Sequence, residues 1–480
     1  LKTSKLTRLN DFEMVNLQRK CLVNSQAPNP SVETLLHAFL PFKYVDHTHA
    51  SAILGLIDQP NDVEVCKAAF GNQVGIVPYI IPGFDLAKLS YKIFSKNKNV
   101  IGLILLKHGI FTFGNNAKES YDRMIKLVTI AEKKINKVTN KILTKKLTSK
   151  KIKPQIVNDL FPLIRKYLSK KEKNGSDSKW VLDLRTNDKI LKYLNNPNLK
   201  DFSQRGPVTP DHVIRIKPKP LILNIKHERA KNLDNIFRRE IETFKKNYHK
   251  YFLRNRKYVS KPTELDSNPR LILSPGLGLI GIGRSKKEAK IASDLAEITV
   301  DVISKAESIG KFKSIPDKEI FKVEYWPLEQ AKLKNSPSRN EYDGKVVIIT
   351  GAASGIGEAC VTAYIAKGAV VAALDINPEV EEKYDTSNAR GIVCDITNEV
   401  SIRQAVEKCV ANFGGIDVLV CNAGAFPPSV KIEELSAEAL QKSMDLNFQG
   451  HIAMLRLCTP FLKLGFDASV ILVIMFLPIL

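Results

Sequence analysis

The feature that most constrains the fold of this 480-residue chain is a glycine-rich turn between an apolar strand and a helix. Residues 345–349 predict a buried strand, and residues 358–367 predict a helix. The turn between them, Thr350-Gly351-Ala352-Ala353-Ser354-Gly355-Ile356-Gly357, lets backbone N–H groups approach a pyrophosphate. A second predicted strand ends at Asp375, where a carboxylate can accept a ribose 2′-hydroxyl. The pattern predicts a dinucleotide-binding sheet that favours NAD, because the carboxylate would repel the extra phosphate of NADP.

Two further predicted strands extend this sheet, at residues 391–394 and 418–420. With Asn447 on a later predicted helix, the pattern resembles the short-chain dehydrogenase/reductase family, which implies a Rossmann fold and NAD as cofactor. The implied cofactor-binding residues are Gly351, Ser354, Gly355, Ile356, Gly357, Asp375, Asp395, Asn422, Ala423 and Gly424. The resemblance implies a catalytic role for Asn447; the alternative is an asparagine at a helix kink.

The sequence departs from that family after the fifth predicted strand, residues 469–474. The family has a catalytic serine after this strand and a Tyr-x-x-x-Lys pair on the next helix, and neither follows here. Tyr167 and Lys171 have the spacing but lie far upstream in a charged segment. We therefore expect this half to bind NAD without hydride transfer by itself, and we expect the chain to be incomplete at this end.

The second informative feature is the pair His47 and His49. Alternate residues of a strand point to the same side, so both imidazoles can reach one metal ion. His108 follows another predicted strand, residues 100–106. Three histidines at strand ends leave open coordination positions, which is typical of a catalytic metal site. The alternative for an isolated His-x-His pair is chance.

Upstream of these histidines, Glu33 and His37 lie on one face of a predicted helix with Ser31 as its N-cap. Residues 30–137 resemble the class II aldolase/adducin family. The motifs that carry the resemblance are Glu33 with His37, Asp46-His47-Thr48-His49, Val77-Pro78-Tyr79 with Pro82-Gly83, and Lys107-His108-Gly109.

This resemblance implies that His47, His49 and His108 bind Zn²⁺ and that Glu33 is the catalytic acid/base. Zinc polarises a ketose carbonyl, and a carboxylate beside it moves protons. The alternative for Glu33 is an exposed helix carboxylate, and His37 lies either behind the ligands or on the helix surface. The family's Gly/Asn/Ser phosphate loop has no match before Glu33, so we expect it to precede Leu1.

The middle region is internally similar to the first. At a constant offset of 169 positions, two apolar residues, two glycines and a long predicted helix recur. The matched residues are Leu103-Ile104 with Ile272-Leu273, Gly109 with Gly278, and Gly114 with Gly283. We therefore expect a degenerate aldolase-like copy without a metal, in which Leu277 replaces His108 and Asp211-His212 loosely corresponds to Asp46-His47.

The glycines of this region also match a dinucleotide fingerprint, Gly276-x-Gly278-x-x-Gly281. That fingerprint needs an acidic residue that closes a second strand about 20 positions on. Asp301 has the distance, but it lies within a predicted helix that no second strand precedes. We therefore reject a dinucleotide site here.

Composition limits the class of partner and the compartment. The net charge is +23, but the lysines are dispersed, and the densest run, residues 133–173, contains few aromatic residues. Solvated helix and linker explain that run better than nucleic-acid binding. Seven cysteines without a Cys-x-x-Cys pair predict a reduced cytoplasmic protein. We see no signal peptide and no tract long enough to span a membrane, and an initial Leu suggests a fragment.

The predicted fold class is α/β. We expect a class II aldolase-like domain at residues 1–140, the middle region at 141–335 and a truncated Rossmann domain at 341–480. This order resembles one bifunctional family, in which a rhamnulose-1-phosphate aldolase is joined to a lactaldehyde dehydrogenase. The resemblance implies cleavage of a sugar phosphate, oxidation of the aldehyde product with NAD, and self-association. The alternative is an NAD(P)-dependent short-chain oxidoreductase whose aldolase-like part is a non-catalytic oligomerisation module.

Overall fold

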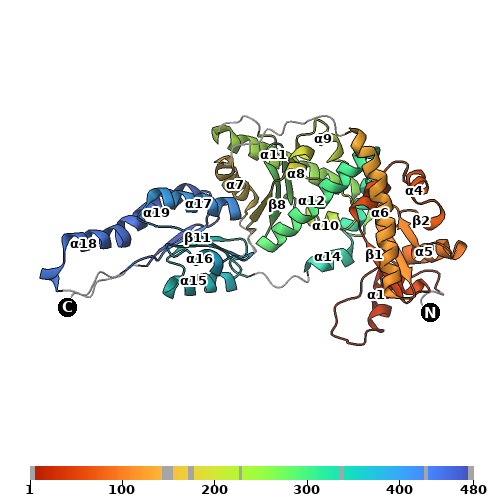
Figure 1. The fold of residues 1–480 in the computed structure, drawn as a ribbon, viewed down its shortest axis with the longest axis horizontal. Helices are drawn as coiled ribbons and strands as arrows, with labels where there is room; N and C mark the ends of the chain where they lie inside the picture. Colours follow the sequence, from red (N-terminus) through yellow and green to blue (C-terminus); the bar gives the residue numbers. More distant parts are fainter. Residues whose placement is uncertain are drawn as a thin grey trace.

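The computed structural model describes residues 6–142, 155–170, 178–225, 230–334, 340–425 and 431–473. Three β-sheets follow one another along the chain and along the longest axis of the molecule (Figure 1). Their strands lie within residues 44–114, 181–283 and 346–472. Helices accompany all three sheets, so the α/β fold class is confirmed.

The first sheet has the strand order β1-β4-β3-β2, in which only β2 and β3 are parallel. Apolar side chains point from both of its faces: one face packs against α2 and α5, and the other against α3 and α6. The elements of this domain are α1 (Asp11–Arg19), α2 (Thr34–Phe39), β1 (Tyr44–Thr48), α3 (Ser51–Ile57), α4 (Asp62–Phe70), η2 (Gly71–Gln73), β2 (Val74–Val77), α5 (Phe84–Lys96), β3 (Gly102–Leu105), β4 (Gly109–Gly114) and α6 (Ala117–Ile142).

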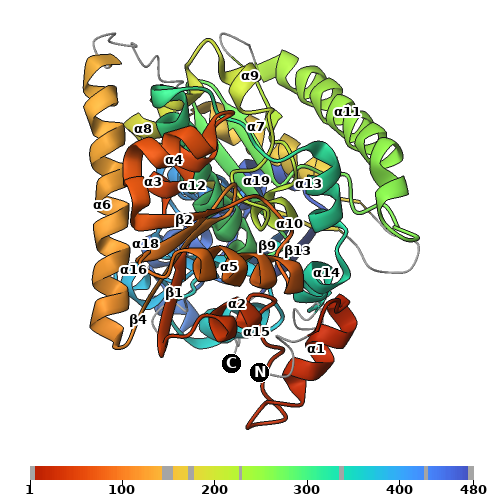
Figure 2. The same cartoon turned by 90° about the vertical axis from the view of Figure 1, so that its right-hand side faces the viewer.

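The second sheet repeats this topology with the order β5-β8-β7-β6, and again only the last pair is parallel. Its long helix α11 and the first domain's α6 run along opposite sides of the molecule (Figure 2). The elements are α7 (Gln155–Leu168), β5 (Val181–Arg185), α8 (Asp188–Leu194), α9 (Leu199–Phe202), α10 (His212–Ile216), β6 (Leu221–Ile222), α11 (Ala230–Asn255), η3 (Arg256–Tyr258), β7 (Leu271–Ser274), β8 (Gly278–Gly283), α12 (Lys286–Ile309), α13 (Asp317–Glu324) and α14 (Pro327–Lys334).

The register of the central hairpin supports the predicted internal repeat. Leu103 pairs with Phe111 in the first hairpin, and Ile272 pairs with Ile280 in the second, so both partners keep the offset of 169 positions. The third strand of the match is β5, not the Asp211 segment, because β5 pairs with β8 as β1 pairs with β4. The predicted correspondence of Asp211-His212 with Asp46-His47 is therefore wrong.

The equivalences that follow from this pairing show which residues of the second copy replace the predicted metal ligands. His47 lies opposite Phe111, and Leu184 lies opposite Ile280, so Leu184 replaces His47. Two residues further on, Thr186 replaces His49, and Leu277 replaces His108. Of the glycines of the rejected dinucleotide fingerprint, Gly278 and Gly281 lie in strand β8 and Gly276 lies in the turn before it.

The third sheet is parallel throughout, in the order β11-β10-β9-β12-β13. In chain order these strands run 3-2-1-4-5, as in a doubly wound sheet, and β9 lies at the centre. The elements are β9 (Val346–Thr350), α15 (Gly355–Ala366), β10 (Val370–Asp375), α16 (Val380–Lys383), β11 (Ala389–Val393), α17 (Glu399–Phe413), β12 (Val418–Cys421), η4 (Ile432–Glu434), α18 (Ala437–Met444), the π-helical η5 (Asp445–Gln449), α19 (Gly450–Leu462) and β13 (Ser469–Leu472).

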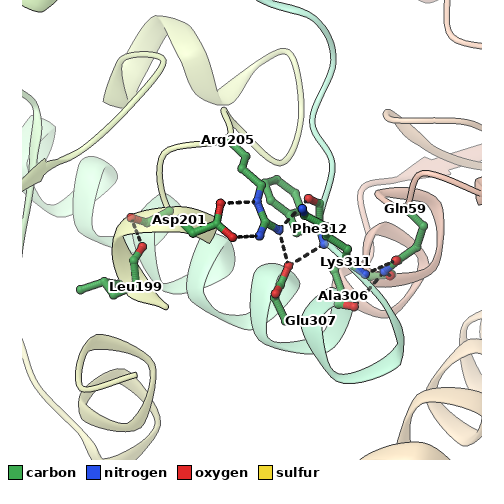
Figure 3. Close-up of polar contacts among 10 residues, drawn as sticks. Gln59, Leu199, Asp201, Arg205, Ala306, Glu307, Lys311 and Phe312 are labelled. Atoms are coloured by element: carbon green, nitrogen blue, oxygen red, sulfur yellow. Dashed lines mark hydrogen bonds and ion pairs between the residues drawn. The ribbon is translucent and has the colours of Figure 1, made fainter. Parts of the chain in front are cut away.

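The first and second domains share one apolar core and a buried polar junction. The core joins α3 and α6 of the first domain to α12 of the second. At the junction the Gln59 amide donates to the carbonyls of Gly55 (3.1 Å) and Ala306 (2.9 Å), and its oxygen accepts the Lys311 N–H (2.9 Å). Figure 3 shows this contact beside Arg205, which pairs with carboxylates of the second domain. Buried hydrogen bonds of this kind fix the two domains against each other.

A second core joins the middle domain to the third. It combines α7, β5 and α11 with β9, β10 and α17. At its edge the Arg165 guanidinium pairs with Asp417 at 2.5 Å, and both side chains are buried. The middle domain is therefore attached on both sides by buried contacts.

None of the described helices has the length and apolar character to cross a bilayer. Each of the seven cysteines is free.

Candidate functional site

The three predicted metal ligands converge because of how β1 pairs with β4. Thr48 lies opposite Ile110, so the end of β1 meets the turn that joins β3 to β4. His47 comes from β1, His49 follows it, and His108 lies in the turn. Their ligand nitrogens all lie within 4.8 Å of one another, and the Nε2 atoms of His47 and His49 are 3.0 Å apart.

Glu33 reaches this cluster from the start of α2. One carboxylate oxygen lies 2.8 Å from Nε2 of His108, and the other lies 3.6 Å from Nε2 of His47. Helix α2 begins at Thr34 with Glu33 as its N-cap, so the predicted Ser31 cap is wrong; the Ser31 hydroxyl instead accepts the Glu33 N–H. Glu33 is thus a carboxylate of the cluster and not an exposed helix residue.

Burial and neighbouring charges set the protonation of the cluster. Burial acts to raise the pKa of Glu33, but the hydrogen bond and charge of His108, with smaller contributions from the other two histidines, outweigh it and lower that pKa to about 2. Burial lowers the pKa of His47 to about 3. The Glu33 carboxylate acts to raise this pKa, and the two nearby histidines lower it further. At neutral pH the site therefore holds an ionised carboxylate and a neutral His47 imidazole, which is the metal-binding form.

Contacts with β4 orient the His47 ring. Its Nδ1 lies 2.9 Å from the carbonyl of Ile110, so Nδ1 carries the proton and Nε2 faces the cluster with a free lone pair. The ring also stacks on Phe111 with 4.0 Å between the centroids. His37 lies behind this layer, because its Nδ1 bonds to the Val45 carbonyl at 3.0 Å and its ring packs edge-on against Phe111.

The second domain adds a residue that sequence reasoning misplaced. Asp211, just before α10, brings a carboxylate oxygen to 3.9 Å from Nδ1 of His49. Its neighbour His212 is buried and bonds to Thr209 at 2.6 Å. The sequence alone does not place Asp211 near the histidines, because only the packing of the two domains brings them together.

The donor set fits a catalytic zinc ion. Three imidazoles are a known catalytic zinc ligand set, and a carboxylate oxygen of Glu33 lies 2.8 Å from Nε2 of His108. His47, His49 and His108 would hold the ion.

The glycine-rich turn of the third domain has the shape that a dinucleotide needs. Gly351 and Gly355 have φ angles of +66° and +55°, which side chains other than glycine rarely adopt. A Cβ on Gly357 would lie 2.0 Å from the carbonyl oxygen of Gly351. The amide of Asn422 donates to the carbonyls of Thr350 and Gly351, at 3.0 and 3.2 Å. The turn therefore lies at the N-terminus of α15, a position of the kind that can bind a pyrophosphate.

Other predicted cofactor residues lie around this turn. Asp375 ends β10 and accepts the N–H groups of Ala353 and Asn377, both at 2.9 Å. Asp395 follows β11 and accepts bonds from Thr397. Ser354 precedes α15, Ile356 is exposed on its first turn, and Ala423 and Gly424 follow β12. The structure thus gathers these residues at the carboxyl ends of neighbouring parallel strands.

Asn447 lies in the π-helical segment η5 and braces the loop after β12. Its side chain accepts the Ala425 N–H at 3.0 Å and donates to the Ala425 carbonyl at 2.9 Å. π-Helical turns are frequent at functional sites. Residues 474–480, where we expect no catalytic serine or Tyr-x-x-x-Lys, lie outside the described residues, as does Lys171. Tyr167 lies in α7 of the second domain and donates to Asp234.

Comparison with known families assigns each part of the chain. The class II aldolase and adducin N-terminal domain matches residues 2–135, the class II aldolase second domain matches residues 155–333, and the short chain dehydrogenase family matches residues 345–475. The chain combines these three domains. They are called the aldolase domain, the second aldolase domain and the dehydrogenase domain below.

Individual relatives cover different shares of the chain. Uncharacterized oxidoreductase YuxG of Bacillus subtilis (strain 168) is 32% identical over 469 residues, which are 94% of this chain and 66% of that protein. D-threitol dehydrogenase of Mycolicibacterium smegmatis is 40% identical over 118 residues, 23% of this chain and 45% of that enzyme. A solved N-terminal class II aldolase domain from Thermoplasma acidophilum is 43% identical, covers 28% of this chain and 62% of that chain, and has a TM-score of 0.27.

Proposed function

We propose that the aldolase domain cleaves a ketose 1-phosphate with the help of a zinc ion. We further propose that the dehydrogenase domain binds NAD, the cofactor for oxidation of the aldehyde product, but does not carry out this oxidation by itself. The observation that carries the proposal is the meeting of three imidazoles and one ionised carboxylate at a single point. A non-catalytic oligomerisation module has no use for this set. By the family resemblance, we further propose a self-associating cytoplasmic enzyme that acts on a sugar phosphate and an aldehyde.

The chemistry divides between the metal and Glu33. Zinc held by His47, His49 and His108 would polarise the ketose carbonyl and so favour cleavage of the carbon–carbon bond beyond it. Cleavage also removes a proton from the hydroxyl at that bond and delivers a proton to the released carbon. We assign these proton transfers to Glu33, because its ionised carboxylate lies beside the ligand nitrogens of His47 and His108.

For the dehydrogenase domain we propose NAD as the cofactor. The Asp375 carboxylate closes β10 beside the turn, where it can accept the ribose 2′-hydroxyl and repel a 2′-phosphate. Asn447 would position the loop that follows β12. The similarity to an enzyme named D-threitol dehydrogenase supports a small hydroxylated compound as the substrate of this domain.

The first substrate to test is rhamnulose 1-phosphate, with release of dihydroxyacetone phosphate as the readout. We expect the zinc-loaded protein to release it and Glu33→Gln to do so about a hundredfold more slowly or worse. Glu64→Gln, a change at an exposed carboxylate of the same domain, is the matched control and should cleave at the wild-type rate. Absence of cleavage with every ketose 1-phosphate tried would favour the oligomerisation module instead.

Binding of NAD is tested separately by calorimetry. We expect binding to the wild-type chain, weaker binding of NADP, and loss of binding in Gly357→Ala, because the new methyl group would collide with the Gly351 carbonyl. Tighter binding of NADP than of NAD would contradict the role given to Asp375.

A further inference from the structure

The residue before His108 has a backbone conformation that its side chain makes costly. Lys107 has φ = +61°, in the left-handed region. A residue other than glycine is strained in such a conformation. The equivalent residue of the second aldolase domain is Gly276, with φ = +81°.

The two turns are otherwise the same. The His108 N–H donates to the Leu105 carbonyl, and the Leu277 N–H donates to the Ser274 carbonyl, both at 3.1 Å. The turn therefore needs no side chain at this position, as Gly276 shows. A lysine with this strain is explained if its side chain does something that the metal-free copy does not need.

The Lys107 side chain folds inward and is almost fully buried, with 8% of the residue exposed. Its ammonium donates to the Gln59 carbonyl at 2.6 Å and pairs with the Asp62 carboxylate at 3.2 Å. Gln59 lies in the segment between α3 and α4, and Asp62 is the first residue of α4. The turn that carries His108 is thus fastened to this segment by a charged group in a buried site, where such bonds are strong.

The same segment is fastened to the second aldolase domain. The Gln59 side chain bonds to Ala306 and Lys311 at the end of α12 (Figure 3), and the Asp58 carbonyl accepts the Lys313 N–H at 2.9 Å. Gly310 packs so closely on Gln59 that a Cβ there would lie 2.4 Å from the amide oxygen. A continuous set of short contacts therefore leads from α12 through Gln59 and Lys107 to His108.

We propose that Lys107 is a positioning residue through which the second aldolase domain holds His108 in place for the metal. The inference rests on the proposed metal-dependent function. It assigns the metal-free copy a part in metal binding: it supplies the rigid support for one ligand turn. Residues that support metal ligands in this way typically change metal affinity by 10- to 100-fold when they are lost.

The test is the dissociation constant for Zn²⁺ of the full chain, measured by competition with a chromophoric chelator. Lys107→Gly suits the left-handed backbone but removes the ammonium, so we expect zinc to bind about 10- to 100-fold more weakly. Lys261→Gly is the matched control, because Lys261 is an exposed lysine with φ = +45° in the second aldolase domain; its affinity should equal that of the wild type. Lys107→Arg keeps a cation and should restore most of the affinity, whereas Lys107→Met should not.

The outcomes separate this inference from the proposed function. If the wild type binds zinc and Lys107→Gly binds it equally well, the positioning role is overturned while the metal site stands. If Lys107→Gly does not fold, equal affinities of Lys107→Arg and Lys107→Met overturn the role. If the wild type binds no zinc, the proposed function and this inference both fail.

Discussion

The two aldolase domains share strand order, hairpin register and turn geometry but use equivalent positions for opposite purposes. In the aldolase domain, His47 and His108 face a cluster of polar side chains with Glu33. In the second, Leu184 and Leu277 occupy these positions, and Leu277 lies in an apolar core that continues into the dehydrogenase domain. The first copy has polar side chains that can bind a metal at these positions, and the second copy has apolar side chains that pack in a core.

The exchange has a physical basis. Buried imidazoles without a metal or partner are costly, whereas leucines at the same positions gain stability from apolar burial. The second copy can therefore act as a rigid connector between two functional domains. Its contribution to the aldolase site comes from outside its own sheet, through Asp211 and the end of α12.

The largest expected effect comes from making the first copy resemble the second. His108→Leu introduces the residue found at position 277 and removes one metal ligand. Loss of several kcal/mol of charge stabilisation by the metal corresponds to a fall of about a thousandfold in cleavage rate. The measurement is kcat/KM for ketose 1-phosphate cleavage with zinc in excess. A variant within tenfold of the wild type would contradict the role of His108 as a metal ligand.

The next effect concerns the structural copy. Arg165→Ala leaves Asp417 buried without its guanidinium partner, and we expect the free energy of unfolding to fall by about 3–5 kcal/mol. Zinc affinity should stay unchanged, since Arg165 lies on the side of the dehydrogenase domain. Urea denaturation followed by circular dichroism measures the change, with the exposed Arg239→Ala as control. A loss of zinc in Arg165→Ala would show that the two roles are not separate.

A smaller effect is the dependence of stability on pH that His47 causes in the first copy. Burial lowers the pKa of His47 to about 3, so the unfolded chain takes up a proton near pH 6.5 that the folded chain refuses. The free energy of unfolding of the zinc-free protein should therefore fall as the pH drops from 6.5 toward 3. His47→Leu, which introduces the residue of the second copy, should reduce the loss between pH 6.5 and 4.5 by up to about 2 kcal/mol. Equal pH slopes for the two proteins in urea titrations would contradict the burial of a neutral His47.

The smallest expected effect tests the contact between the copies. Asp211→Asn removes the negative charge beside His49 and should weaken zinc binding by about tenfold, the low end of the range for such supporting residues, because the carboxylate is half exposed. Asp188→Asn, at an exposed position on α8, is the control. Equal zinc dissociation constants for the two variants would remove Asp211 from the site.

The sequence predicted the elements whose patterns are local. The glycine-rich turn, Asp375 and the strands around them lie where expected, and the offset of 169 identified the repeated hairpin. The error over Asp211 has a clear cause. The chain between β5 and β8 is longer than that between β1 and β4, since it contains α11, so a constant offset fails outside the hairpin.

Contacts between distant segments could not be predicted from the sequence. The approach of Glu33 to His108, the bond from Lys107 to Gln59 and the placement of Asp211 beside His49 depend on packing between elements and domains. The left-handed backbone of Lys107 also gives no sequence signal of its own, because lysine is common and its strain appears only in the folded turn.

The most direct test of the division of roles is the zinc content of the purified chain, combined with X-ray absorption at the zinc edge to count imidazole ligands. We predict about one zinc ion per chain with three imidazole nitrogens near 2.0–2.1 Å, and none in His108→Leu. A folded wild-type chain without zinc, or zinc retained in His108→Leu, would contradict the account.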